Sequence, residues 1–296
     1  MPASLVEIAP AKVNLTLRVV GRRDDGYHEL ESLVVFADFG DRLGLVPGGE
    51  LSLRVRGPSA AQAGPGDDNL VLKAVRALTA RRAGLRLGAF TLDKKLPVAA
   101  GVGGGSADAA AALRLIAQAN DIPGDDRELY AAARATSADV PVCLDPRPRI
   151  MRGIGEILSV PLLLPRLPAV LVNPRVAVPT KAVFTAWKDA AVKSATPPLD
   201  PVGGLTNREP LLRFLETQAN DLEAPAITLA PAIAEVLAAL RSLSGCRLAR
   251  MSGSGATCFA LFAGRDAARA AGRALRDKYA HWWVRTGILG GNLSPH

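Results

Sequence analysis

The sequence is poor in cysteine and in long apolar runs, and each shortage excludes a class of protein. Its 296 residues include three cysteines, Cys143, Cys246 and Cys258, which lie far apart and match no metal-ligand spacing. A sparse, odd number of cysteines is typical of free thiols in a reducing compartment, which argues against a disulfide scaffold. No apolar run approaches the roughly 20 residues that span a bilayer, and the first residues lack the pattern of a signal peptide. We therefore expect a cytoplasmic protein without a membrane partner.

Aromatic residues are also scarce, at 4% of the chain, whereas the net charge is +8. A basic chain could bind nucleic acid, could bind an anionic small molecule, or could simply come from an arginine-rich genome. The arginines are spread along the sequence, and no basic run is interleaved with aromatic residues that would stack on bases. We therefore expect no nucleic-acid partner.

What the sequence does contain is a mixture of strand and helix patterns. Apolar and polar residues alternate over Val13–Val19, which predicts a half-buried strand. Apolar residues that keep to one face predict a helix directly after Asn69, and a run of Ala, Leu and Ile predicts another over Ala109–Ala119. Prolines interrupt the pattern between residues 146 and 168, and we place a domain boundary there.

The stretch AGVGGGSADAA, residues 100–110, predicts an anion-binding loop. Backbone N–H groups at a glycine-rich turn, followed by a helix N-terminus, attract a negative group, which is usually a phosphate. The loop is not a Walker A motif, because no Gly-Lys-Ser/Thr follows. It is not a clean dinucleotide fingerprint either, because Ser106 stands where the last glycine would be. The structural alternative is a flexible surface turn before an alanine-rich helix.

Further segments could contribute chemistry, although each has an ordinary structural explanation. Lys12 stands where a strand begins, and a lone lysine there is usually a solvated edge charge. Ser137 can cap a helix, which would place Asp139 in the first turn, where an acidic side chain commonly serves the helix dipole. The Gly/Ser loop at the start of MSGSGATCFALF could be an ordinary tight turn. The adjacent Tyr27 and His28 could be structural residues.

Taken together and in this order, these segments resemble the GHMP kinases. The resemblance rests on PAKVNLTLRVVGRRDDGYHELESL, LPVAAGVGGGSADAAAALRLI, SADVPVCL, GIGE, NDLEAPA and MSGSGATCFALF, and it extends from about residue 7 to residue 285. It implies an α+β, two-domain GHMP kinase fold with the active site in the cleft between the domains. An N-terminal ATP-binding domain would cover residues 1–160, and a C-terminal substrate-binding domain would cover residues 161–296.

The resemblance implies catalytic roles for Lys12 and Asp139, which would face each other across a substrate hydroxyl group. An alcohol is a poor nucleophile at neutral pH, so a base must take its proton as phosphoryl transfer proceeds. A nearby lysine would favour the ionised carboxylate or stabilise the transferring phosphoryl group. The implied ATP-binding residues are Asn69, Pro97, Ala100, Gly101, Val102, Gly103, Gly104, Gly105, Ser106 and Ala107.

The resemblance also implies a small-molecule substrate that carries a cytidine diphosphate group. The residues expected to bind it are Asn14, Tyr27, His28 and Phe184. ATP is the implied co-substrate and implies Mg²⁺, for which the sequence shows no carboxylate cluster. Ser106 and Asp108 are the only candidate ligands, so phosphates and water would hold most of the metal's coordination sites. We expect a monomer or a weak homodimer.

The sequence departs from the family pattern at a few positions, and two alternatives to this reading stay open. Ala107 stands where a second serine is usual, Pro146–Arg147 where two glycines are usual, and Val142 where phenylalanine is common. Another GHMP small-molecule kinase is one alternative, which the Tyr27–His28 pair disfavours. A catalytically silent nucleotide- or RNA-binding protein on the same scaffold is the other, and the presence of both Lys12 and Asp139 argues against it.

Overall fold

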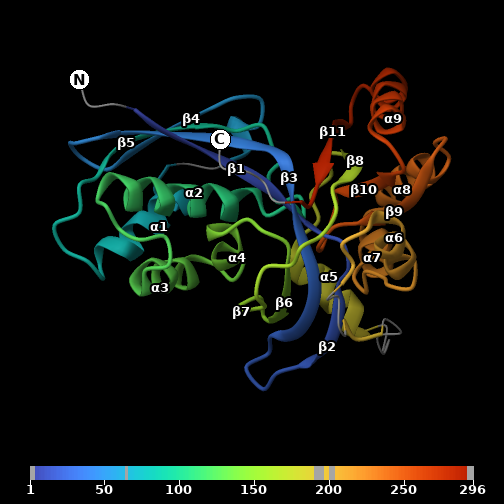
Figure 1. Ribbon diagram of the computed structural model, residues 1–296, viewed down its shortest axis with the longest axis horizontal. Coiled ribbons are helices and arrows are strands. Elements are labelled where there is room, and N and C mark those ends of the chain that lie inside the picture. Colours follow the sequence, from blue (N-terminus) through green and yellow to red (C-terminus); the bar gives the residue numbers. More distant parts are fainter. Residues whose placement is uncertain (1–3, 64–65, 190–196, 200–203, 292–296) are drawn as a thin grey trace. The chain divides into compact units, whose positions relative to one another are not determined.

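The computed structural model describes residues 4–63, 66–189, 197–199 and 204–291, and within them the chain forms two compact units (Figure 1). The first unit comprises the chain up to Lys12, Phe39–Val98 and Gly103–Pro146. The second comprises Val13–Asp38, Ala99–Val102 and the chain from Arg147 onward. Each unit is therefore assembled from several segments of sequence. The linear division at residue 160 stays a prediction.

The first unit is a mixed sheet with helices along one side (Figure 1). Strand β5 (Gly88–Asp93) pairs antiparallel with the second half of β3 (His28–Pro47) and parallel with β4 (Ser52–Arg56), and β1 (Leu5–Asn14) also pairs with β3. Its α-helices are α1 (Leu70–Thr79), α2 (Gly104–Ala119), α3 (Arg127–Thr136) and α4 (Val140–Leu144), and two short 3₁₀ turns cover Ala60–Gln62 and Gly66–Asp68.

Helix α1 begins where the sequence predicted, because Asn69 caps it. The Asn69 side-chain oxygen accepts the Val71 N–H at 3.0 Å, which satisfies one of the free donors of the first turn. Helix α2 begins earlier than the predicted Ala109, at Gly104, so the glycines themselves form its first turn. Most of the alanine-rich remainder is buried.

The second unit is built on antiparallel strands. Strands β11 (Trp283–Leu289), β8 (Leu167–Asn173), β10 (Cys258–Phe262) and β9 (Cys246–Met251) follow one another in that order in the sheet. Strands β2 (Arg18–Arg22) and β6 (Arg149–Gly153) pair with the first half of β3, and β7 (Ile157–Leu158) pairs with β6. The helices are α5 (Thr180–Asp189), α6 (Arg208–Glu216), α7 (Glu223–Leu229), α8 (Ala232–Arg241) and α9 (Arg265–Lys278).

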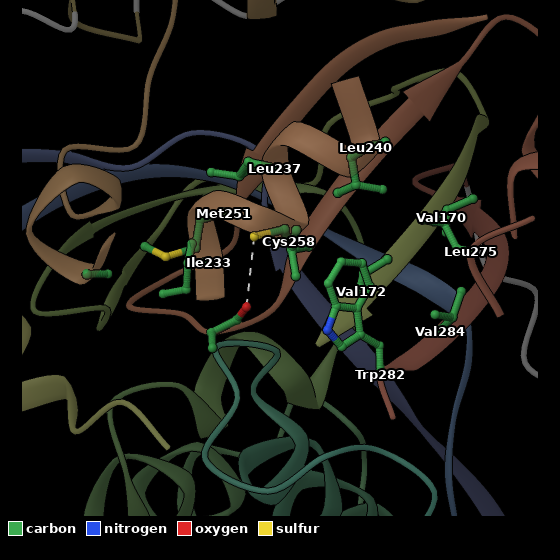
Figure 2. Packing of buried hydrophobic residues seen from close by; sticks show 14 of the residues in the cluster. Val170, Val172, Ile233, Leu237, Leu240, Met251, Cys258, Leu275, Trp282 and Val284 are labelled. Carbon is green, nitrogen blue, oxygen red and sulfur yellow. Dashed lines mark hydrogen bonds between the residues drawn. The ribbon is translucent and has the colours of Figure 1, made fainter. Parts of the chain in front are cut away.

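An apolar core holds these strands and helices of the second unit together (Figure 2). Val170 and Val172 of β8 lie in one buried cluster with Leu237 of α8, Leu275 of α9 and Val284 of β11. Each fully buried side chain of this size contributes about 1.5–3 kcal/mol relative to leaving it in water. Since Met251 and Cys258 belong to the same cluster, the core also fixes both ends of the Gly/Ser loop between β9 and β10.

The prediction of one half-buried strand over Val13–Val19 is wrong. Strand β1 ends at Asn14 and β2 begins at Arg18, and every residue from Ala9 to Leu17 is buried. The polar residues of the alternating pattern are satisfied inside the unit rather than by solvent. Asn14 Nδ2 donates to Ser32 Oγ at 2.7 Å, and Thr16 Oγ1 accepts the Leu33 N–H at 3.0 Å. Alternation therefore marked internal hydrogen bonding here and not a solvent face.

Among the described residues, no helix is both long enough and apolar enough to cross a membrane.

Candidate active site

Lys12 and Asp139 are in direct contact in the first unit. Lys12 Nζ lies 2.7 Å from Asp139 Oδ1, and the side chains are 3% and 35% exposed. The lysine is therefore not the solvated edge charge that a lone strand lysine usually is. Its ammonium group is buried against the Asp139 carboxylate. That carboxylate is partly exposed and can therefore contact a further group.

The sequence predicted Asp139 in the first turn of α4, but Asp139 immediately precedes that helix. Its side chain makes no capping hydrogen bond. Ser137 does not cap α4 through its side chain; it follows α3, and its carbonyl oxygen accepts the Val140 N–H at 3.1 Å. The Asp139 carboxylate is thus not used by its own helix, and Lys12 orients it.

The glycines at the start of α2 permit close packing on two lysines. Gly103 has a φ of +60°, and a Cβ there would come within 3.2 Å of Lys12 Cβ. A Cβ on Gly104 would come within 3.1 Å of Lys94 Nζ. The first turn of α2 receives no side-chain cap. Its N–H groups lie next to two cations, an arrangement that favours a bound anion, and the anion site itself stays a prediction.

The preceding residues, Ala100 and Gly101, pack on the second Gly/Ser loop within the second unit. Ser252 Oγ donates to the Gly101 carbonyl oxygen at 2.8 Å, and the Thr257 N–H donates to the Ala100 carbonyl oxygen at 3.1 Å. Gly101 has a φ of +73°, and a Cβ would lie 2.4 Å from the Ser252 carbonyl oxygen. The sequence singled out both loops, and the structure brings these parts of them together.

Ser252 also connects this loop to Asn14. The Asn14 N–H donates to Ser252 Oγ at 3.0 Å, so one hydroxyl group joins Gly101 and Asn14. Ser252 was not among the predicted site residues. The only sequence signal for it was its place in the MSGSGATCFALF segment.

The remaining predicted nucleotide residues of the first unit lie around the same turn. Asn69 uses its side-chain oxygen to cap α1, and the next residue, Leu70, would lie 3.3 Å from a Cβ on Gly105. Ser106 is 8% exposed, whereas Ala107 is fully buried and presents no side chain to solvent. Pro97 is half-buried and follows β5 by a few residues. Val102, in the second unit, is fully buried.

A buried ion cluster lies under this turn, and sequence reasoning missed two of its members. Lys94 Nζ lies 2.5 Å from Asp41 Oδ2 and 2.6 Å from Asp108 Oδ2, and all three side chains are at most 3% exposed. Asp41 Oδ1 also accepts the N–H groups of Lys95 and Leu96. Asp108 was expected as a candidate magnesium ligand, but Lys94 engages its carboxylate.

One ammonium group faces two carboxylates in this cluster, so an excess negative charge is buried. The pKa of Asp108 is raised to about 7, mainly by burial; the charge of Lys94 opposes the rise, and the charge of Asp41 adds to it. The pKa of Lys94 is itself raised, because its two carboxylate partners outweigh the lowering effect of burial. Asp108 Oδ1 has no hydrogen-bond partner among the described residues. We therefore assign the bound proton to this oxygen.

We expect Asp108→Asn to flatten the pH dependence of stability. Because the folded pKa of Asp108 lies above its unfolded value, the folded state binds the extra proton and loses stability as pH rises from about 4 to about 7. This group alone lowers the free energy of unfolding by up to about 1.4 kcal/mol per pH unit in that window. Urea unfolding at several pH values measures the free energy of unfolding. Between about pH 4 and pH 7, the loss of this free energy that Asp108 causes in the wild type should be absent in Asp108→Asn.

The control for this experiment is Asp68→Asn. Asp68 is 84% exposed in its contact with Lys73, so this substitution makes the same charge change at the surface. Parallel pH profiles for the wild type and Asp108→Asn would contradict the assignment of the proton to Asp108.

Aromatic side chains gather where β3 begins. The rings of His28 and Phe184 stack, with centroids 4.8 Å apart and planes 18° apart. Trp187, which the sequence reasoning missed, meets His28 edge-on at 5.6 Å. Tyr27 is 60% exposed in the preceding turn, where its N–H donates to Asp25. The structure thus brings together His28 and Phe184 of the predicted substrate residues, whereas Asn14 belongs to the Ser252 network.

No carboxylate cluster for a metal was expected, and the part of the chain that the structure describes contains no group of three or more His, Cys, Asp or Glu side chains suited to holding one.

Comparisons with known proteins agree with this geometry. Two family models match the chain, the GHMP kinases N terminal domain over residues 69–145 and the GHMP kinases C terminal model over residues 206–281. A homoserine kinase from Cytophaga hutchinsonii shares the fold, with a TM-score of 0.69 over 97% of this chain and 95% of that one at 21% identity.

Proteins with a higher sequence identity to this chain indicate which family within the GHMP kinases it belongs to. A Methylobacterium radiotolerans protein named 4-diphosphocytidyl-2-C-methyl-D-erythritol kinase is 59% identical over 96% of this chain and 99% of its own length. A Rhodopseudomonas palustris protein of the same name is 57% identical over 97% of each chain. A crystal structure of 4-(cytidine 5'-diphospho)-2C-methyl-D-erythritol kinase is 37% identical, with a TM-score of 0.76 over 97% of this chain and 100% of that one. The chain therefore belongs to the GHMP kinases, in the 4-diphosphocytidyl-2-C-methyl-D-erythritol kinase family.

Proposed function

We propose that this chain transfers the γ-phosphoryl group of ATP to the 2-hydroxyl group of 4-diphosphocytidyl-2-C-methyl-D-erythritol. The products are the 2-phosphate and ADP, and the reaction serves isoprenoid precursor biosynthesis by the non-mevalonate pathway. Relatives at 57% and 59% identity carry the name of this kinase. The observation that carries the chemistry is the contact of 2.7 Å between Lys12 and the half-open carboxylate of Asp139.

Asp139 is the proposed general base. Its carboxylate takes the proton of the 2-hydroxyl group as the hydroxyl oxygen bonds to the γ-phosphorus and the bond to ADP breaks. Lys12 is bound to Asp139 Oδ1, so it holds the carboxylate in one orientation. Its positive charge also stabilises the negative charge that develops on the transferring phosphoryl group.

The start of α2 is the proposed phosphate site. The N–H groups of Gly103, Gly104, Gly105 and Ser106 would donate to phosphate oxygens, and the absence of a side-chain cap leaves the first turn available for this. Asn69 and Pro97 would contact the nucleoside, along with Ala100, Gly101, Val102 and Ala107 as further loop residues. Bound Mg²⁺ would neutralise phosphate charge, with Ser106 as the candidate protein ligand and Asp108 disfavoured by its contact with Lys94.

Asn14, Tyr27, His28 and Phe184 are the proposed substrate-binding residues. A cytosine ring would replace one ring of the His28–Phe184 stack or extend it, because aromatic side chains and bases stack on each other's faces. Asn14 would contact the methylerythritol group through its side-chain oxygen, since its side-chain nitrogen already donates to Ser32.

We expect Phe184→Ala to raise KM for the cytidine substrate by about tenfold or more, because stacking on a base contributes about 1–3 kcal/mol. The kcat value and the KM for ATP should change much less, since Phe184 lies on α5 and the proposed base and phosphate loop lie elsewhere in the sequence. Steady-state kinetics with each substrate varied in turn measures both values. A fall in kcat at an unchanged KM would contradict the substrate-binding role.

The function itself is tested by ADP release with ATP, magnesium and 4-diphosphocytidyl-2-C-methyl-D-erythritol. Homoserine and mevalonate serve as comparison substrates, because both are alcohols phosphorylated by other GHMP kinases. Turnover with the cytidine substrate well above the other two supports the proposal, and turnover only with one of the others overturns it.

We propose that the enzyme acts in the cytoplasm as a monomer or weak homodimer. Sedimentation at several protein concentrations would test the oligomeric state.

A further inference from the structure

A cavity lies outside the candidate active site, entirely within the second unit. Its volume is about 440 Å³, and its wall includes Gln218, Glu223, Arg241, Arg247 and Arg250. These residues come from the segment between α6 and α7, the start of α7, the end of α8, and β9. The wall includes part of the NDLEAPA segment, to which the proposed reaction gives no role. A cavity of this size can hold a small metabolite.

The charge of the wall is positive. Arg250 is 7% exposed, and it donates hydrogen bonds to the carbonyl oxygens of Leu15, Leu215 and Gln218. Among the described residues no carboxylate lies within ion-pair distance of its guanidinium group. Burial lowers the pKa of Arg250 to about 10, and the charge of Glu223 only partly offsets this effect. A ligand anion next to the guanidinium group would favour its charged form further.

The other two arginines differ in how firmly they are held. Arg247 makes a two-point contact with Glu209, at 2.7 and 3.0 Å, and is therefore largely neutralised. Arg241 is 57% exposed and meets Glu223 at only 3.5 Å. Glu223 already accepts the Met251 N–H through its other oxygen. Arg241 can thus turn toward a ligand at little loss, and a guanidinium group binds an oxyanion through two parallel hydrogen bonds.

We propose that this cavity binds a small phosphate ester. Arg241 and Arg250 supply the positive charge for the phosphate. The site is separate from the proposed ATP and substrate residues.

Cys246 provides a reporter for this site. It lines the cavity and is half-buried, whereas Cys143 and Cys258 are fully buried. Burial raises the pKa of all three thiols, to about 12 for Cys143. A neutral alkylating reagent such as iodoacetamide should therefore react first at Cys246, and peptide mass spectrometry identifies the labelled residue.

The experiment measures the rate of Cys246 labelling with glycerol 2-phosphate as the probe and sodium chloride at equal ionic strength as the reference. A non-hydrolysable ATP analogue is present in both, so that the nucleotide site is filled. We expect the probe to slow labelling about threefold or more in the wild type. Arg241→Gln should abolish that protection, and Arg269→Gln should keep it. Arg269 is a suitable control because it is 61% exposed on α9 and does not line the cavity.

Other results would overturn the proposal. Equal labelling rates with probe and chloride show that the cavity does not bind the ester, and full protection in Arg241→Gln shows that it binds elsewhere. A further pair of reactions omits the ATP analogue, and protection seen only in that pair assigns the effect to the nucleotide site and overturns the proposal. Calorimetric titration of the same probe into the wild type and Arg241→Gln, again with the ATP analogue present, gives a reading that does not depend on thiol reactivity. Binding heat should be lost in the variant, and equal heats would overturn the proposal.

Discussion

Asp139→Asn should lower kcat by about a thousandfold, within the range of 10²–10⁴ that general base catalysis contributes. Asparagine has the same shape as aspartate and can still accept from Lys12 through its side-chain oxygen, so the contact at 2.7 Å in the wild type should persist in some form. What the variant loses is the ability to take a proton. The KM values for ATP and the cytidine substrate should therefore change little. Initial-rate measurements of ADP release give all three numbers.

The matched control is Asp125→Asn, which removes the same charge from an exposed position before α3. It should leave kcat unchanged. If Asp139→Asn retains more than about a tenth of the wild-type rate, Asp139 is not the base, and positioning with charge neutralisation would account for most of the catalysis. If the wild type itself shows no turnover with the cytidine substrate, the proposed function fails and the Asp139 comparison has no meaning.

The parts of the site that could be predicted are those that lie within one short segment or have a strong local conformational demand. The loop at Gly103 is an example, because its left-handed φ favours glycine. The start of α1 after Asn69 is another, since the apolar face that predicted the helix repeats within a few residues. In both cases the physics that selects the residue type acts locally, so the sequence carries the signal directly.

The parts that could not be predicted depend on pairs distant in the sequence. Lys94 and Asp41 are 53 residues apart, and no periodicity links them. The hydroxyl group of Ser252 bonds to Gly101, 151 residues away. Apolar patterns report which side of an element is buried, but they do not report which polar groups meet there. The break between β1 and β2 was missed for the same reason, because Thr16 is satisfied by a partner on β3 and not by water.

Lys12 and Asp139 are also far apart in the sequence, and yet the sequence analysis named them together. The pairing came from a resemblance to a family and not from the spacing of the residues. On local grounds alone, the lysine was an edge charge and the aspartate a helix-dipole residue. The contact at 2.7 Å shows that both local explanations are incomplete for these two residues.

Lys94→Ala should be the most destabilising single substitution among the residues around the phosphate loop. It leaves Asp41 and Asp108 buried, at 0% and 2% exposure, with no cation between them. Removing one partner of a buried ion pair typically lowers the free energy of unfolding by about 3–5 kcal/mol, because the remaining charge is uncompensated. Urea unfolding at pH 9, well above the Asp108 pKa of about 7, measures the loss. The neighbouring Lys95→Ala is the control, since Lys95 is 44% exposed and meets Asp93 at 3.5 Å, and it should cost at most about 1 kcal/mol.

A double substitution separates charge from packing in this cluster. If the uncompensated carboxylates cause the loss, adding Asp108→Asn to Lys94→Ala should recover a substantial part of it, because one of the two buried negative charges disappears. If the cavity left by the lysine side chain causes the loss, the double variant should be no more stable than Lys94→Ala. Equal stability of Lys94→Ala and Lys95→Ala would contradict the cluster's role altogether.

The ion cluster also lies next to the proposed phosphate site, because Lys94 Nζ would lie 3.1 Å from a Cβ on Gly104. A cluster held by charge therefore supports the turn that we propose binds the ATP phosphates. The KM for ATP should then rise in Lys94→Ala and fall back in the double variant.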